Sequence, residues 1–553
     1  MKYRLALAIL ATLMGASMIL ASTSMQSSQP EKEPEEGTRV HLLHADMLYF
    51  DDRIHRTAQF LVGNVQFEHD GTLMYCDSAM FYEASNSFDA FGHVLLNQGD
   101  TLTLVGEELY YNGIDKLARV RYNVVLKHRE TRLYTDSLDY DRLYDLGYFF
   151  EGGRLLDKDN ELISDWGEYS PATRNATFNY NVRLQSPASP KPARTVLLSD
   201  TLHYNTRTEV AHVVGPSNIE HGGNHVYTEQ GYYHMNTDFA YLLERSILQN
   251  GAKRLVGDSI VWDNIHHEGE AFGDAVYTDE ENKNILMGQY CYYNDSTGYA
   301  EATDSALVID YSQKDSMFAH ADTLKMFTYN IETDSVYRVL HAYHHMRAYR
   351  QDVQAVCDSM VYISKDSCLT MYRDPILWMN DQQVLGEEIK AFFNDSTIDS
   401  IQVLRQTLSV ERMTDKHYNQ VAGHVMRIYF KNGDVDLTQV EGNVMLNYYP
   451  LDDDSLMIGM NHTETTLMKL FMKSRKVDHV WMPAAQGTLY PLPLIPPDAL
   501  YLENFQWFDY IRPLNKDDIF VWRPKKEGTE LKETARRQPP KQKLKDIRQQ
   551  KEQ

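Results

Sequence analysis

An acidic residue followed by an alternating apolar strip recurs along the chain at nearly constant spacing. A catalytic residue is needed once, whereas a residue that returns at a fixed interval is usually part of the architecture. The interval of about 29 residues therefore predicts stacked copies of one structural unit, with Asp136-Ser137 as a marker of that unit and not a catalytic pair. The acidic positions are Asp46, Asp77, Glu107, Asp136, Asp165, Asp200, Glu229 and Asp258, separated by 31, 30, 29, 29, 35, 29 and 29 residues.

Each repeat contains two strand-like halves. In one half, within phrases such as "FGHVLL" and "RYNVVL", Val and Leu alternate with polar residues. In the other half, the residues two and four positions beyond the acidic residue are apolar or aromatic. Alternation at period two places each set on one face of a strand, and turn sequences such as "NQGD" and "DKDN" separate the halves. The 37 Tyr and 20 Phe also favour strands over helices.

Two local features stand apart from the repeat. Residues 464–476, "ETTLMKLFMKSRK", are the one stretch with a helical apolar stripe. The four cysteines, Cys76, Cys291, Cys357 and Cys368, are too few for a disulfide framework in 553 residues. A bridge between Cys357 and Cys368 stays open in an oxidising compartment.

The N-terminus predicts export. Residues 1–24 combine Lys2 and Arg4 with an apolar run and then small residues, the pattern of a cleaved secretory signal peptide; an uncleaved anchor is the alternative. Residues 25–39 read as a linker. No later segment approaches the roughly 20 apolar residues of a membrane-spanning helix. The net charge of −24 argues against nucleic acid as a partner, since phosphate backbones bind Lys and Arg.

The repeat divides the mature chain into modules. We expect β repeats over 40–185, a Pro-rich insertion at 186–195, and less regular β repeats over 196–450. Residues 451–523, with clustered prolines and with Trp507 and Trp522, predict a cap that plugs the end of the array or a docking segment. Residues 524–553 are basic with few apolar residues, which predicts a disordered tail.

Tandem phrases of the form "GNVxL" and "DSLxY" behind a signal peptide resemble the OstA-like family, which includes LptA and the periplasmic N-terminal domain of LptD. The likeness is good over about 40–310 and weaker over 311–450. It implies a β-jellyroll of stacked antiparallel strands, in one or more tandem modules. It further implies a non-enzymatic periplasmic protein that holds lipopolysaccharide or another amphiphilic lipid by its acyl chains and contributes to outer-membrane assembly. Implied partners are other Lpt-type envelope proteins, or further copies of the chain, joined by edge-strand pairing.

The resemblance also implies a set of residues that contact acyl chains. They are the apolar positions with shared parity in successive repeats, and no cofactor is implied. The same positions would be apolar in an array whose interior is filled by its own side chains. The predicted groove residues are Val65, Phe67, Val94, Leu96, Val124, Leu126, Leu138, Tyr140, Val182 and Leu184.

Other site classes are less well supported by the sequence. Calcium β-rolls use dense Gly-Gly-x-Gly-x-Asp repeats, which do not occur here. His341, His344 and His345 alternate across a strand and do not converge as metal ligands, and His266-His267 receives the same interpretation. No metal site is therefore predicted. A structural scaffold for envelope proteins and a polysaccharide-active β-solenoid enzyme stay as alternatives, and the basic tail is either solvated or bound to anionic lipid headgroups.

Overall fold

The computed structural model describes residues 39–534, apart from 52, 54, 187–193, 332, 395–396, 453, 455, 474–475, 530 and 532–533. These residues form strands and five short 3-10 helices and contain no α-helix, which confirms the predicted all-β class. None of the helices in this described part has the length and apolarity needed to cross a membrane. The predicted signal peptide, the linker before Arg39 and most of the Pro-rich insertion lie outside the described residues.

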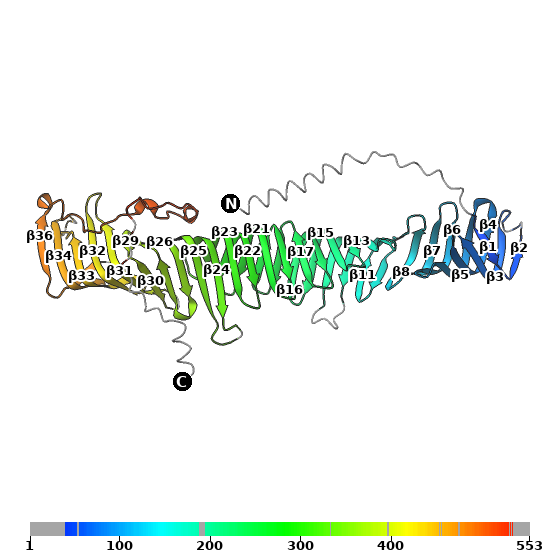
Figure 1. Ribbon diagram of the computed structural model, residues 1–553, viewed down its shortest axis with the longest axis horizontal. Coiled ribbons are helices and arrows are strands. Elements are labelled where there is room, and N and C mark those ends of the chain that lie inside the picture. Colours follow the sequence, from blue (N-terminus) through cyan, green and yellow to red (C-terminus); the bar gives the residue numbers. More distant parts are fainter. Residues whose placement is uncertain are drawn as a thin grey trace, which may run out of the picture. The chain divides into compact units, whose positions relative to one another are not determined.

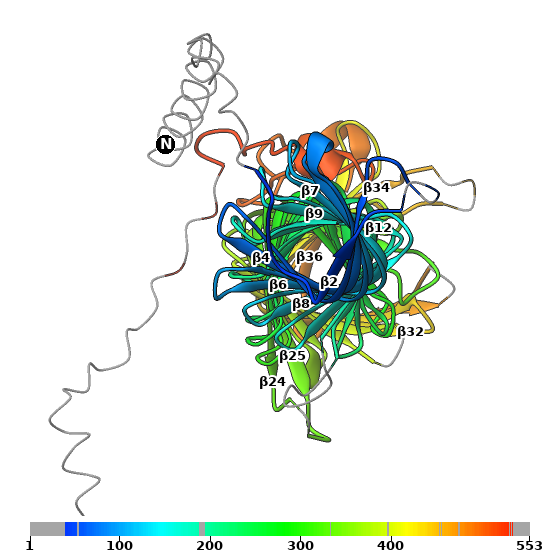
Figure 2. The same ribbon diagram turned by 90° about the vertical axis from the view of Figure 1, so that its right-hand side faces the viewer.

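The chain divides into two compact units, and Figure 2 looks onto the β2 end of the first. The described part of the first unit is residues 39–158 and 164–176. Its elements are β1 (His41–His44), β2 (Met47–Tyr49), β3 (Gln59–His69), β4 (Thr72–Tyr82), η1 (Glu83–Ser85), β5 (Ser87–Gln98), β6 (Leu102–Asn112), β7 (Leu117–His128), β8 (Thr131–Asp141), β9 (Leu146–Phe149), β10 (Gly153–Asp157) and β12 (Trp166–Ser170).

The second unit is residues 159–163 and the described residues from 177 onward, and its strands follow one another in chain order from β13 to β36 (Figure 1). Its elements are β11 (Asn160–Ser164), β13 (Asn175–Gln185), β14 (Val196–Asn205), β15 (Val210–His221), β16 (Asn224–His234), β17 (Phe239–Leu243), β18 (Ser246–Asn250), β19 (Lys253–Gly257), β20 (Ser259–Asp263), β21 (Glu268–Asp279), β22 (Asn284–Asn294), β23 (Tyr299–Asp310), β24 (Met317–Tyr329), β25 (Tyr337–Arg350), β26 (Val353–Ile363), η2 (Ser364–Asp366), β27 (Cys368–Tyr372), β28 (Ile376–Met379), β29 (Gln382–Leu385), β30 (Glu388–Phe393), β31 (Ile398–Arg412), β32 (Tyr418–Lys431), β33 (Asp434–Tyr448), β34 (Gly459–Lys473), β35 (Lys476–Trp481), β36 (Gln486–Pro491), η3 (Leu492–Leu494), η4 (Asp509–Ile511) and η5 (Asp518–Phe520).

A two-residue corner interrupts the long strands. The antiparallel ladder of β3 and β4 shifts between Val62 and Val65, and the intervening Gly63 and Asn64 have φ of +82° and +47°. Such a bulge bends the strand. Equivalent corners with two left-handed residues are Gly92-His93, Tyr122-Asn123, Tyr180-Asn181, Gly273-Asp274, Asp304-Ser305, His344-His345, Arg405-Gln406 and Gly442-Asn443.

The corners divide each sheet into two walls that face each other. We call the wall containing Val65–His69 wall A and the wall containing Gln59–Val62 wall B, and use the same names for equivalent parts of later strands. Phe67 of wall A stacks on Phe88 of wall B with ring centroids 4.1 Å apart. The walls therefore enclose a common apolar interior, as the predicted stacked-strand jellyroll requires.

The recurring acidic residue holds the corner of the neighbouring strand. Asp46 donates its backbone N–H to the Gly63 carbonyl at 2.9 Å, and its carboxylate accepts a hydrogen bond from Asn64 Nδ2 at 2.9 Å. An ideal Cβ on Gly63 would lie 2.3 Å from Asp46 Oδ2, so the left-handed conformation and the close carboxylate together require glycine. The Asp46 carboxylate therefore joins its own segment to the corner of β3.

The structure corrects the expectation of a helix at 464–476 and settles the possible cysteine bridge. Residues 464–473 belong to strand β34, not to a helix, because β34 pairs with β33 on one side and with β35 and β36 on the other. That pairing satisfies the backbone along most of the strand and overrides the local helical stripe. The bridge between Cys357 and Cys368 is also not formed, since all four cysteines are free.

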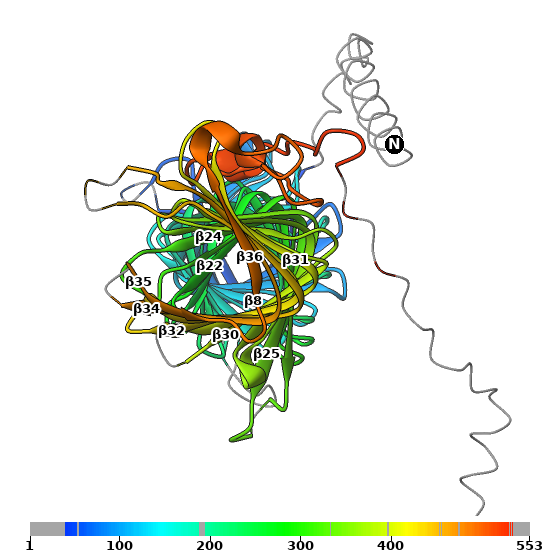
Figure 3. The same cartoon turned by 90° about the vertical axis from the view of Figure 1, so that its left-hand side faces the viewer.

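After β36 the chain turns back as an irregular segment, residues 499–523, that we call the strap. Figure 3 looks onto the β36 end and shows the strap on the outside of the sheet. Leu502, Phe508 and Ile511 of the strap are buried in an apolar cluster with side chains of the outer face of wall A. The wall residues of this cluster are Val356, Ile376, Trp378, Leu385, Leu408, Val410, Tyr418 and Ala422.

Side-chain amides of wall A hold the main chain of the strap. Gln383, fully buried, donates to the Gln506 carbonyl and accepts from the Phe508 N–H, both at 2.8 Å. Gln420 makes the same pair of bonds to the Leu500 carbonyl at 2.9 Å and the Leu502 N–H at 2.8 Å. These amides take the place of a backbone ladder.

Two charged groups fix the far end of the strap. Arg512 donates to Gln354 Oε1 at 2.6 Å. Arg347, fully buried, donates to the Ile511 carbonyl at 3.2 Å and lies 3.7 Å from the Asp518 carboxylate. Burial lowers the pKa of Arg347 to about 10, so the guanidinium stays charged at neutral pH. Trp507 packs against the apolar cluster and Trp522 lies 4.5 Å from the His345 ring.

The corner geometry predicts different effects of two glycine substitutions. Gly92 (φ +74°) would place a Cβ 2.5 Å from Asp77 Oδ2, whereas Gly99 (φ +61°) has no atom within 4 Å of that position. Gly99→Ala should lower the free energy of unfolding by only the left-handed penalty, about 1–2 kcal/mol. Gly92→Ala should lower it further, because the carboxylate must also move. Urea unfolding followed by circular dichroism measures both, and equal losses would contradict the role of Asp77.

The hydrogen bonds from Gln383 to the strap predict that removing this side-chain amide releases the strap locally. Gln383→Leu leaves the Gln506 carbonyl and the Phe508 N–H without their partner, a loss of about 1–3 kcal/mol. Hydrogen exchange at the Phe508 amide should speed up while exchange in β3–β8 stays unchanged. Gln402→Leu, at a half-buried glutamine of β31, is the control. Unchanged protection at Phe508 would show that the amide does not hold the strap.

Candidate functional site

The ten predicted groove residues all lie in the interior between the walls. Each is at most 1% exposed. Val65, Phe67, Val94, Leu96, Val124 and Leu126 come from wall A of the first unit, Leu138 and Tyr140 from wall B, and Val182 and Leu184 from wall A of the second unit. Within each unit the interior strip is therefore apolar along successive strands, and at these positions its own side chains fill it.

Polar side chains join the two walls at the edge opposite the corners. In the first unit, His69 Nδ1 lies 2.6 Å from the Tyr111 hydroxyl, and Arg142 also donates to that hydroxyl at 2.6 Å. His128 Nδ1 lies 2.9 Å from the Tyr169 hydroxyl. In the second unit Asn160 donates to Tyr204 at 3.1 Å. The apolar interior therefore ends at a row of polar pairs, which we call the mouth.

Burial favours the neutral forms of Tyr111 and His128 in the mouth, and the guanidinium of Arg142 beside Tyr111 is the charged group there. Loss of solvent raises the pKa of Tyr111 and lowers the pKa of His128, so near pH 7 the phenol keeps its proton and the imidazole is uncharged. The neutral bond between His128 and Tyr169 contributes about 0.5–1.5 kcal/mol, and the bond from the charged Arg142 to Tyr111 about 1.5–3 kcal/mol. The mouth thus joins the walls by separable side-chain contacts, while the corners join them through the continuous backbone.

Two cavities lie away from the predicted residues. One, of about 40 Å³, lies beside Lys253, whose Nζ is 2.8 Å from Asp295. The other, of about 540 Å³, is an open hollow on the strap lined by Trp507, Tyr510, Leu514 and both arginines of that segment, Arg512 and Arg523, together with Asp509. Neither is lined by any of the ten groove positions.

The histidines of "HAYHHMR" have structural partners. His344 and His345 occupy a corner, with φ of +60° and +54°, in place of the Gly-Asn pair of other repeats. His345 Nδ1 lies 2.8 Å from Asp322 and His344 Nδ1 lies 3.3 Å from Asp358. His341 instead stacks on Tyr343. Each of the two corner histidines therefore meets the carboxylate of a different neighbouring strand.

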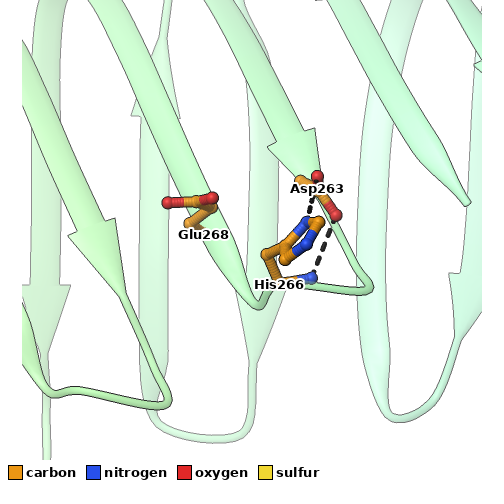
Figure 4. A group of neighbouring side chains, drawn as sticks. All are labelled: Asp263, His266 and Glu268. Atoms are coloured by element: carbon orange, nitrogen blue, oxygen red, sulfur yellow. Dashed lines mark hydrogen bonds and ion pairs between the residues drawn. The ribbon is translucent and has the colours of Figure 1, made fainter.

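A second histidine group lies in the hairpin between β20 and β21 (Figure 4). Asp263, His266 and Glu268 have potential ligand atoms within 4.8 Å of one another. His266 Nδ1 is 2.7 Å from Asp263 Oδ2, and the Ile265 and His266 N–H groups donate to Asp263 Oδ1 at 3.0 Å. Partial burial acts to raise the pKa of Asp263, but the bonds from His266 lower it overall. These contacts account for the group as a hairpin turn.

The sequence did not predict the polar pairs of the mouth or the glutamines that bind the main chain of the strap. His69 lies two residues beyond Phe67, and His128 lies two residues beyond Leu126. Alternation along a strand therefore predicts that both histidines point inward like the predicted groove residues. Their tyrosine partners, 42 and 41 residues away, carried no such signal. Gln383 and Gln420 also lacked one, because a buried glutamine and a surface glutamine look alike in sequence.

Comparisons with known proteins give a family for part of the chain. The model of the OstA-like protein family matches residues 37–190. Among solved structures, LptH from Pseudomonas aeruginosa, described as the LptA-homologous periplasmic component of the lipopolysaccharide transport device, aligns at 17% identity, over 22% of this chain and 82% of LptH, with a TM-score of 0.19. No curated protein sequence matches the chain.

The matched residues coincide with β1–β13, the corners at Gly63, Gly92, Tyr122 and Tyr180, and all ten predicted groove residues. Residues 37–190 of this chain are therefore similar to the OstA-like family.

Proposed function

We propose that the chain is a non-enzymatic periplasmic protein that binds lipopolysaccharide by its acyl chains between walls A and B and contributes to outer-membrane assembly. The observation that carries the proposal is the inward apolar strip of Val65, Phe67, Val94, Leu96 and their equivalents, within the OstA-like segment. Keeping acyl chains from water is worth about 0.8 kcal/mol per CH₂, which a continuous apolar strip supplies without a deep local minimum.

The packed interior sets a requirement for binding. Because Phe67 already stacks on Phe88 at 4.1 Å, an acyl chain enters only if the walls separate. The mouth suits such separation, since polar side-chain pairs rather than a backbone ladder join the walls there. Lipid binding on this account replaces contacts among interior side chains with contacts to acyl chains.

The same packing supports a second candidate function. An interior whose ten predicted positions are at most 1% exposed also suits a scaffold that holds envelope proteins on its surface and binds no lipid. A polysaccharide-active enzyme lacks a comparable observation in its favour. The partners we propose are Lpt-type envelope proteins that pair with an edge strand of the array.

Native mass spectrometry of the mature protein from envelope fractions separates the two candidates. A bound mass that releases lipid A-containing material on extraction supports the transport function. A lipid-free mass that stays unchanged after incubation with lipopolysaccharide overturns it and supports the scaffold.

Adjacent residues on opposite faces of β7 provide a matched test. Leu126 is 1% exposed in the interior, whereas its neighbour Val125 points to the other face and is half-buried. Leu126→Asp should abolish lipid loading, because a carboxylate in an apolar groove is costly to desolvate, and Val125→Asp should leave it unchanged. Leu126→Trp, which fills the groove without charge, guards against loss of folding, monitored by circular dichroism. Normal loading of a folded Leu126 variant would rule out this strip as the lipid site.

A further inference from the structure

The open hollow on the strap has the size of a small-molecule site. Its volume of about 540 Å³ lies within the roughly 300–1,000 Å³ of typical ligand pockets. Every residue that lines it belongs to the strap, so its shape depends on the strap being held on wall A. The hollow is also separate from the interior between the walls, because none of the ten groove positions lines it.

Arg512 is a half-buried cation of this hollow that has no counter-ion. Its Nε and Nη2 donate to the Gln354 side-chain oxygen at 2.8 and 2.6 Å, and Nη2 also donates to the Asn380 carbonyl at 2.8 Å. Both acceptors are uncharged. Within the described residues Arg512 forms no ion pair, and its Nη1 has no hydrogen-bond partner. Since a partly buried charge is stabilised by a partner of opposite sign, Nη1 offers a position for an anionic group.

The second arginine of the hollow is already neutralised. Arg523 Nη1 donates to Asp518 Oδ2 at 2.9 Å, and its Nη2 donates to the other carboxylate oxygen. The bonds from Arg523 hold the pKa of Asp518 below its usual range. Arg523 therefore lines the hollow without a free charge, and Arg512 is the side chain that can hold an anion.

The remaining side chains favour a ligand that is more than a simple anion. Asp509 lines the hollow, and in the part of the chain that the structure describes its carboxylate has no hydrogen-bond or ion-pair partner. A carboxylate accepts bonds from hydroxyl groups and repels a bare anion. Trp507, Tyr510 and Leu514 add apolar surface, with Tyr510 43% and Leu514 70% exposed. Aromatic side chains of this kind cover the apolar face of a ring.

We propose that the strap hollow binds an acidic saccharide, a sugar that carries a carboxylate or a phosphate. Arg512 holds the acidic group, and Asp509 accepts bonds from the sugar hydroxyls. Trp507 and Tyr510 pack against the ring. This chemistry occurs both in a soluble oligosaccharide and in the headgroup of an amphiphile. The site lies outside the walls, so the inference holds whether or not acyl chains bind between them.

Isothermal titration calorimetry of the full mature chain with digalacturonate, maltose and inorganic phosphate tests the assignment. Digalacturonate should bind at least about tenfold more tightly than maltose, which lacks the acid, and than phosphate, which lacks the hydroxyls and the ring. Arg512→Gln should weaken binding of digalacturonate at least about tenfold, because the charge-assisted bond is lost. Arg350→Gln is the matched control, since Arg350 has its own partner in Asp352 at 2.6 Å and does not line the hollow.

A second variant leaves the bonds between Arg512 and wall A intact. Asp509→Ala removes the hydroxyl acceptor and also the charge that repels phosphate, so the preference for digalacturonate over phosphate should fall at least about threefold. Saturating digalacturonate should in addition slow hydrogen exchange at the Phe508 amide of the unmodified chain, because a ligand stabilises the state that binds it and the hollow requires the docked strap.

Lipid A dispersed in detergent separates the two sources of the saccharide. If the part of its binding that Arg512→Gln removes is tighter than binding of digalacturonate, the ligand is a headgroup; if that part is equal or weaker, the ligand is a soluble saccharide. No binding of digalacturonate, or binding that neither Arg512→Gln nor Asp509→Ala changes, would overturn the proposal. Tighter binding of a triaspartate peptide than of digalacturonate would also overturn it, in favour of an acidic protein segment.

Discussion

The contact between a carboxylate and a left-handed corner on the next strand is the constraint on which the rest of this architecture depends. Asp46 holds Gly63 and Asn64, and Asp77 reaches His93 at 2.7 Å. Each such contact fixes where a strand bends, so the inward parity of wall A and of wall B stays aligned from one strand to the next. A displaced bend would shift one wall by a residue and turn its apolar strip outward. The acidic residue recurs about every 29 residues because each pair of strands needs its bend at the same position.

The interior and the mouth have different chemistry, and the difference bears on function. The interior gains stability from apolar burial, which is non-directional and tolerates exchange of one apolar group for another. The mouth is directional, with pairs such as His69–Tyr111 and His128–Tyr169. A protein that only needed a rigid core would gain little from polar groups there. A protein that admits an amphiphile gains an edge that separates without breaking a backbone ladder.

Much of the fold was predictable because it repeats. Alternation around Val94-Leu96 and Leu138-Tyr140 predicted strands and their buried face, and the recurrent Asp predicted an architectural role. The corner itself was not predictable, because Gly63-Asn64, Tyr122-Asn123 and His344-His345 share a backbone conformation and no common side chain. Residues 464–473 of β34 are the reverse case. Their sequence has a clear helical apolar stripe, but pairing with β33 makes them a strand. For the candidate site, parity located the ten interior residues, whereas contacts between walls depend on which distant strands meet.

The strap is expected to dock after the strands of the repeats have paired, because its contacts join residues that are much farther apart in the sequence. Hydrogen bonds across the mouth join residues about 40 positions apart, so successive repeats assemble from contacts made within a short stretch of chain. Phe508 bonds to Gln383 across 125 positions and Arg347 to Ile511 across 164. Closing a loop of that length costs more entropy and slows the step. During synthesis, the outer face around Trp378 stays uncovered until residues 499–523 emerge. A product that lacks residues 499–523 therefore exposes this apolar surface.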